Sequence, residues 1–188
     1  TQGVSSAASD VYKRQPVIRA NSLYTIVNGP SWSQAEANAA SLGGNLAAVN
    51  NIAENEFLLT AFSGYIPDLS YIGISDLATE GRWLLCDGSK VSFFNWAPGE
   101  PNNNSNYTQE DVAALYFRVQ DYGISGVWND VATDGYGNIA TGISEIPLSL
   151  SITQSTQPKE GAGSFTNSIN LSAGTATSGN LAEGTQVY

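Results

Sequence analysis

Alternating apolar and polar positions predict a first strand over residues 22–27, and helical spacing follows it directly. The strand sequence, SLYTIV, is rich in the β-branched and aromatic side chains that suit a half-buried strand. Ser31 and Gln34 have the spacing of a capping box at the start of a helix. An alanine-rich run follows, and Gly43-Gly44 supplies the residues on which helices commonly end.

The stretch that begins at Asn51 predicts a second helix, NIAENEFLLTAF. Asn51 and Glu54 repeat the capping pattern. Phe57, Leu58 and Ala61 fall on one face of this helix, as core-facing side chains do. Both helices therefore precede most of the predicted strands.

Short apolar runs in the rest of the chain, separated by turn residues, predict an antiparallel sheet. The runs are residues 71–75, 82–86, 112–117, 126–130 and 138–146. Helices followed by antiparallel strands indicate an α+β fold.

The segment between residues 86 and 112 has little regular spacing. Irregular segments of this length inside a compact domain are usually functional or disordered. Phe93, Phe94 and Trp96 predict that packing anchors this one. Its remaining residues are mostly asparagine, glycine, proline and acids, which predicts a polar outer edge.

Charge and composition exclude several function classes. The chain has 7 Lys and Arg against 17 Asp and Glu, a net charge of -10, which disfavours binding to nucleic acid. It has no histidine and a single cysteine, Cys86, which removes His-dependent catalysis, the usual zinc sites and any intrachain disulfide. No apolar run is long enough to predict a transmembrane helix.

Side-chain oxygens gather in two stretches of the sequence, GEPNNNSNYTQED and GVWND. Carboxylate and amide oxygens are the ligands that Ca²⁺ prefers. From the residues alone, either a cation site or ordinary solvated turns would explain them. The oxygens belong to Glu100, Asn102, Asn103, Glu110, Asp111, Asn129 and Asp130.

Residues 23–146, about two thirds of the chain, resemble a C-type lectin-like domain, because six markers occur in the order typical of that family. The markers are residues 32–47 (WSQAEANAASLGGNLA), 71–83 (YIGISDLATEGRW), 87–103 (DGSKVSFFNWAPGEPNN), 109–111 (QED), 126–130 (GVWND) and 142–146 (GISEI). The resemblance implies a double-loop α+β fold with two helices, antiparallel sheets and a long irregular calcium-binding loop.

By the same resemblance, five residues would bind both Ca²⁺ and the sugar: Glu100, Asn102, Glu110, Asn129 and Asp130. Pro101 takes the position of a cis-proline. A Glu-Pro-Asn triplet implies mannose-type sugars (mannose, glucose, N-acetylglucosamine, fucose), whose vicinal equatorial hydroxyls complete the calcium shell. Asp76, Glu80, Asn103 and Asp111 match a second calcium site, although Asn103 stands where stronger calcium binders carry Asp.

The chain departs from the family at its cysteine positions. Ala39 and Val112 occupy positions that usually hold half-cystines, and Cys86 aligns with a residue that is often serine. These departures imply a bacterial or viral version without disulfides. We expect Cys86 to be a small buried filler, and Trp128 to be buried so that it orients Asn129 and Asp130.

Three zones are predicted. Residues 1–20 form a non-domain segment that includes a stretch resembling translated adapter sequence, residues 21–146 form the lectin-like domain, and residues 147–188 form a partial β-sandwich, weakly similar to Calx-β-like adhesion repeats. We expect the chain to be a piece of a larger secreted or cell-surface adhesion protein.

Two other functions stay open at this stage. The domain could use calcium for stability and bind a protein or another surface without sugar. Glu100 and Glu110 could alternatively act as the paired carboxylates of a glycosidase. We expect no enzymatic activity, because the resemblance assigns both carboxylates to the cation.

Overall fold

The structure is a computed structural model that describes residues 16–103, 109–118, 125–135, 138–152 and 169–173. It has two helices and a mixed sheet in these ranges, which confirms the predicted α+β fold. Among the described residues, none of the helices has the length and apolar character needed to cross a membrane.

Both helices begin at the predicted caps. Helix α2 (Trp32–Ser41) starts after Ser31, whose Oγ accepts a hydrogen bond from the backbone N–H of Gln34 at 3.3 Å. Helix α3 (Ile52–Phe62) starts after Asn51, whose Oδ1 accepts from the Glu54 N–H at 2.9 Å. Each cap satisfies a backbone donor that the first helical turn leaves without a partner.

The sheet has the strand order β1-β2-β8-β4-β6-β7, with β3 and β9 paired to β8 and β5 paired to β4. Its strands are β1 (Val17–Arg19), β2 (Ser22–Asn28), β3 (Asn45–Leu46), β4 (Leu69–Ser75), β5 (Leu84–Leu85), β6 (Val112–Tyr116), β7 (Trp128–Val131), β8 (Thr141–Ile152) and β9 (Ile169–Ala173). The prediction of a purely antiparallel sheet is wrong at one place, since β4 pairs with β8 in parallel at Tyr71 and Gly142.

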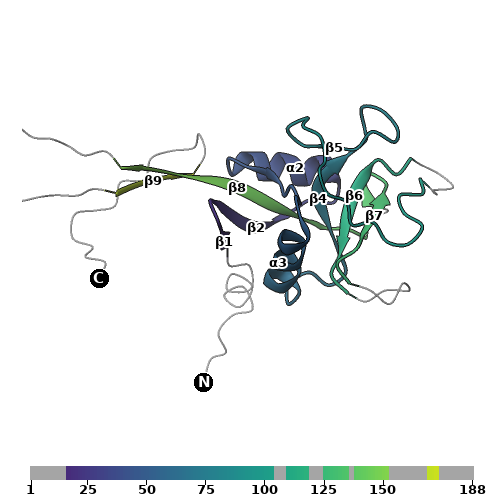
Figure 1. The fold of residues 1–188 in the computed structure, drawn as a ribbon, viewed down its shortest axis with the longest axis horizontal. Coiled ribbons are helices and arrows are strands. Elements are labelled where there is room, and N and C mark those ends of the chain that lie inside the picture. The colour runs from purple at the N-terminus through teal and green to yellow at the C-terminus, as the bar shows by residue number, and fades with distance from the viewer. Residues whose placement is uncertain (1–15, 104–108, 119–124, 136–137, 153–168, 174–188) are drawn as a thin grey trace, which may run out of the picture.

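Two strands cross the predicted zone boundaries. Strand β1 lies within the predicted non-domain segment, yet it pairs with β2 along its length. Strand β8 continues through residue 146 without a break and pairs with β9 beyond the body of the domain (Figure 1). The rest of the predicted β-sandwich, residues 153–168 and 174–188, lies outside the described residues.

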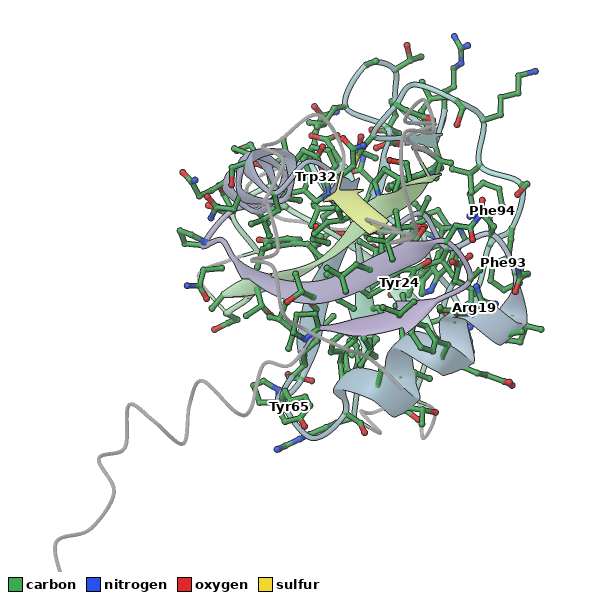
Figure 2. The ribbon with its side chains drawn as sticks, turned by 90° about the vertical axis from the view of Figure 1, so that its left-hand side faces the viewer. Arg19, Tyr24, Trp32, Tyr65, Phe93 and Phe94 are labelled. Carbon is green, nitrogen blue, oxygen red and sulfur yellow. The ribbon has the colours of Figure 1, made fainter. Side chains whose placement is uncertain are left out.

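The core lies on both faces of the β2–β8 pair, with α2 covering one face and α3 the other (Figures 1 and 2). Leu58 and Phe62 of α3 pack in the cluster that contains Trp128. Ala39 of α2 and Val112 of β6 are both fully buried in the second cluster. Apolar packing therefore fills the two positions at which the resemblance expects half-cystines.

A substitution at Gly73 tests how closely β3 and β4 approach. A Cβ there would lie 2.8 Å from the Leu46 carbonyl carbon and even closer to its oxygen. Since backbone atoms must move to admit it, we expect Gly73→Ala to lower the free energy of unfolding by about 1–3 kcal/mol. Gly64→Ala is the control, because no atom lies within 4 Å of a Cβ there. Equal urea midpoints for the two variants would contradict this packing.

Candidate functional site

The two oxygen-rich stretches meet at Asp130, which lies in β7 and is 1% exposed. The backbone N–H of Asn102 donates to Asp130 Oδ1 at 3.1 Å, and that of Asn103 donates to Oδ2 at 2.7 Å. The Glu100–Pro101 peptide is cis, as the resemblance implies. Both oxygens of one buried carboxylate therefore hold the Glu-Pro-Asn segment against β7.

Glu110, two residues before β6, joins this arrangement. Its side chain is buried, and its backbone N–H donates to Asn103 Oδ1 at 2.9 Å. Strands β6 and β7 are antiparallel, with Ala113 opposite Asp130. The structure therefore connects Asn102, Glu110 and Asp130 through Asn103, while Asn129 adjoins Asp130 on β7.

The oxygen atoms at this site suit a hard cation. Asn129 Oδ1 is buried and accepts no hydrogen bond from the described residues, and Glu100 Oε2 is buried as well. A buried polar atom without a partner is costly, and a cation would remove that cost at Asn129. No group of three acidic or cysteine side chains that could hold a metal forms in the described part of the chain. Calcium also accepts amide oxygens as ligands, and Asn102 and Asn129 can supply these beside the carboxylates.

The residues assigned to the second calcium site also lie near one another. Asp76 is 2% exposed; its Oδ2 accepts from the Gly81 N–H at 2.7 Å, and its Oδ1 is buried without a hydrogen-bond partner in the described residues. Burial raises the pKa of Asp76, and the charges of Glu80 and Asp111 raise it further. Asn103 Nδ2 donates to Glu80 Oε2 at 2.9 Å, so this amide is committed to hydrogen bonds at both ends.

Trp128 supports the site from beneath, and sequence reasoning missed its partner. Trp128 is fully buried, as predicted, and its Nε1–H donates to Asn55 Oδ1 of α3 at 2.8 Å. Asn55 Nδ2 in turn donates to the Gly126 carbonyl at 2.7 Å. Asn55 precedes the buried Leu58 by three positions, so a polar residue on the apolar face of α3 was the available signal.

Aromatic packing anchors the irregular segment, as predicted. The Trp96 ring meets Trp128 edge-on at 5.7 Å and Trp83 at 4.7 Å between ring centroids. Phe93 also contacts Trp128, whereas Phe94 stacks on Trp96 and remains 46% exposed at the edge of the molecule (Figure 2). The backbone follows the same path, since the Ala97 N–H donates to the Trp128 carbonyl at 2.8 Å.

The profile of the Lectin C-type domain family matches residues 28–137, more than half of the chain. The chain belongs to this family. Both halves of the oxygen-rich site, residues 100–103 and 126–130, lie within the matched region of this lectin domain.

Relatives of this lectin domain carry sugar-binding names. The Mannose-binding protein of Gallus gallus is 44% identical over 94 residues, which cover 49% of this chain and 32% of that protein. The Alpha-N-acetylgalactosamine-specific lectin of Patiria pectinifera is 34% identical over 92 residues, covering 47% of this chain and 51% of that protein. The chain thus spans about a third and about half of the lengths of these two relatives.

A solved structure has the same fold. The cow C-type carbohydrate-recognition domain of CD23, determined in the presence of a GlcNAc2Man3 oligosaccharide, matches with a TM-score of 0.56 and 25% sequence identity. The match covers 69% of this chain and 91% of that chain. The double-loop lectin fold that the resemblance implied is therefore confirmed.

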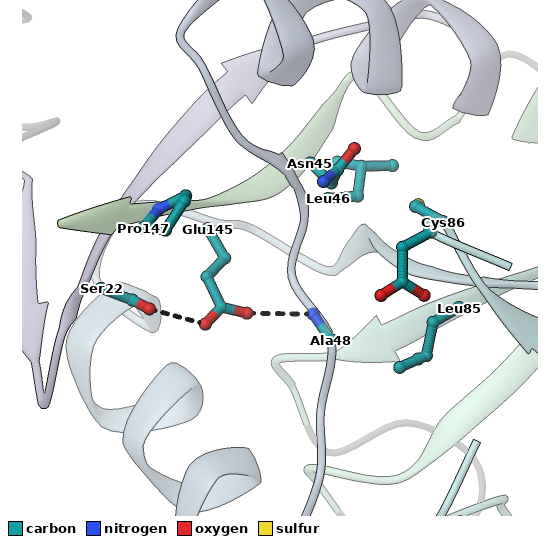
Figure 3. A pocket seen from close by; sticks show the side chains of 9 residues that line it. Ser22, Asn45, Leu46, Ala48, Leu85, Cys86, Glu145 and Pro147 are labelled. Atoms are coloured by element: carbon teal, nitrogen blue, oxygen red, sulfur yellow. Dashed lines mark hydrogen bonds between the residues drawn. The ribbon is translucent and has the colours of Figure 1, made fainter. Parts of the chain in front are cut away.

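A pocket of about 200 Å³ lies elsewhere, between β3, β5 and β8, and contains none of the predicted ligands (Figure 3). Glu145 occupies it and accepts hydrogen bonds from the Ser22 hydroxyl and the Ala48 N–H. Cys86 also lines the pocket and is partly exposed, so the expectation of a buried filler is only partly met. Its thiol donates to Glu36 Oε2 at 3.1 Å.

Removing the Asn55 side chain tests the support beneath the site. Asn55→Ala leaves the buried Trp128 N–H without its acceptor, so we expect a loss of about 1–3 kcal/mol in the free energy of unfolding. Glu56→Ala, an exposed neighbour on α3, is the control and should change it by less than about 0.5 kcal/mol. Urea denaturation measures both, and equal effects would argue against the Trp128–Asn55 bond.

Cys86 should react slowly with alkylating agents. Burial raises the pKa of its thiol, and the Glu36 carboxylate raises it further, so the reactive thiolate is scarce at neutral pH. We expect iodoacetamide at pH 8 to modify the folded domain more slowly than free cysteine, and Glu36→Gln to accelerate the reaction. Glu56→Gln, on the exposed side of α3, should leave the rate unchanged. Alkylation as fast as that of free cysteine would exclude this environment.

Proposed function

We propose that this lectin domain binds carbohydrate in a calcium-dependent manner, and that the same residues hold the cation and the sugar. The residues are Glu100, Asn102, Glu110, Asn129 and Asp130. The carrying observation is the junction at Asp130, where one buried carboxylate joins the Glu-Pro-Asn segment to the Trp-Asn-Asp strand. Asn129 Oδ1, which is buried beside it with no hydrogen-bond partner among the described residues, supports a cation at the same place.

The chemistry needs no catalytic group. When bound, calcium offers coordination positions to two vicinal sugar hydroxyls. Glu100 and Glu110 can accept the hydrogens of those hydroxyls, whereas the amides of Asn102 and Asn129 can donate N–H groups to their lone pairs. Each hydroxyl would then have a partner for its O–H donor and for its lone pairs. We therefore expect binding without hydrolysis.

Sugars of the mannose type are the class we favour, with equatorial vicinal hydroxyls. The support is the order of the triplet, Glu100-Pro101-Asn102, together with the 44% identity to a protein named for mannose binding. The relative from Patiria pectinifera is named for N-acetylgalactosamine, so the family as a whole does not fix the sugar. We choose mannose-type sugars over N-acetylgalactosamine because of the order of residues in the triplet.

We further infer that the domain belongs to a larger secreted or cell-surface adhesion protein of bacterial or viral origin. Cys86 as the single cysteine supports a version that folds without disulfides. The continuation of β8 into a pairing with β9 supports a module joined to the lectin domain. Single lectin domains bind monosaccharides weakly, so several copies would be needed for firm attachment.

Exchanging the donors and acceptors of the triplet tests the site. In the double variant Glu100→Gln with Asn102→Asp, we expect affinity for mannose to fall about tenfold or more, the equivalent of about 1.4 kcal/mol. Chelation of calcium should abolish mannose binding by the unchanged domain. A glycan array with calcium and then with chelator measures both effects.

The matched control is Glu56→Gln with Asn21→Asp, which makes the same two chemical changes at exposed positions. This control should keep full mannose binding. Mannose binding that survives the Glu100 and Asn102 exchange would overturn the site assignment. No sugar binding, combined with a melting temperature that calcium raises, would favour a domain that binds a protein or another surface. Released reducing ends would favour a glycosidase.

A further inference from the structure

Asn103 stands out because one residue joins three separate segments of the domain. Its backbone N–H donates to Asp130 Oδ2 at 2.7 Å in β7. Its side-chain oxygen accepts from the Glu110 N–H at 2.9 Å, and its side-chain Nδ2 donates to Glu80 Oε2 at 2.9 Å. These bonds fix the orientation of the amide, since only its oxygen can accept and only its nitrogen can donate.

The backbone of Asn103 also fits this task. Its φ angle is 47°, in the left-handed region where asparagine is tolerated far better than most residues. This conformation lets consecutive N–H groups, those of Asn102 and Asn103, donate to the two oxygens of Asp130. The side chain is then directed at Glu80 and at the start of β6.

A neutral donor is needed at this point because the surroundings are acidic. Glu80 Oε2 and Asp130 Oδ2 both lie within hydrogen-bond distance of Asn103, and the Glu110 side chain belongs to the bonded neighbour. An aspartate here could still accept from the Glu110 N–H. It would not donate to Glu80, and it would add a negative charge beside two others.

We propose that Asn103 is a positioning residue, whose neutral amide closes the calcium-binding loop by hydrogen bonds before calcium binds. This inference rests on the proposed function for the identity of the loop, and it gives Asn103 a different role from that of a ligand in a second calcium site. The bond to Glu110 joins residues 103 and 110, so two of the proposed ligands, Asn102 and Glu110, are held at a fixed separation.

Calcium then meets ligands that are already ordered. If the loop were ordered only part of the time, the apparent dissociation constant would rise in inverse proportion to the ordered fraction. Asn103→Gly removes the amide but accepts the same φ angle. We therefore expect this variant to bind calcium about tenfold more weakly, as when the ordered fraction falls to about a tenth.

A charge-conserving exchange gives the sharper experiment. Asn103→Asp removes the donor to Glu80, and we expect it to lower the melting temperature in chelator by about 3–5 °C. Adding Glu80→Gln restores a donor and acceptor pair with reversed polarity and the original net charge. The double variant should recover at least half of the loss. Asn21→Asp adds the same charge at an exposed turn and should not lower the melting temperature.

Hydrogen exchange of the Glu110 amide, measured in chelator, distinguishes a local clamp from general stability. We expect faster exchange at Glu110 in Asn103→Gly than can be explained by the change in global unfolding. The inference fails if Asn103→Asp keeps the melting temperature of the unchanged domain, if the double variant recovers nothing, or if Glu110 exchange does not change. All of these readouts are made without sugar, so a domain that binds calcium but no glycan would contradict the proposed function alone.

Discussion

The candidate site depends on the buried carboxylate of Asp130. A carboxylate that is 1% exposed needs a hydrogen-bond donor on each oxygen, and the backbone of residues 102 and 103 supplies both. The irregular segment is thereby attached to a strand of the sheet instead of to another loop. Sites built on regular elements hold their geometry better than sites built on loops. Attachment to β7 therefore keeps the backbone of residues 102 and 103 in a fixed position relative to the sheet.

The strand that carries Asp130 is itself held from below. Trp128 packs against Trp96 and Phe93, and its ring nitrogen is bonded to Asn55 on α3. A tryptophan buried on one face and bonded through its polar atom can adopt few alternative positions. The helix therefore contributes to the site without touching it. Because Cys86 is the single cysteine, the chain forms no internal disulfide, and packing and hydrogen bonds of this kind hold the strand in place.

Local patterns predicted most of the fold, whereas the residues of the candidate site were assigned by the family resemblance. The helix caps at Ser31 and Asn51 and the paired motifs at residues 100–102 and 128–130 are short-range signals, and the structure contains each of them. Strands β1 and β3 were not predicted, because two or three residues have no measurable alternation. The parallel pairing of β4 with β8 was not predicted either, because it joins Tyr71 to Gly142 and no local pattern shows which distant strands lie side by side.

The supporting amides were harder to predict than the ligands. Asn55 is one polar residue in an amphipathic helix, and its importance appears when Trp128 is placed beside it. The family resemblance assigned Asn103 to a second calcium site. The two hydrogen bonds of its side chain join it to residues 23 and 7 positions away along the chain, which no local spacing encodes.

Strand β8 has a mechanical consequence. It pairs with β2 in antiparallel register from Thr141 to Pro147, and the same continuous strand extends to pair with β9. A pull along β8 from its far end would load these pairs in shear, so that their hydrogen bonds would have to break together and not one after another. Tension applied along β8 would therefore be borne by the whole β2–β8 ladder at once, and not by single hydrogen bonds in turn.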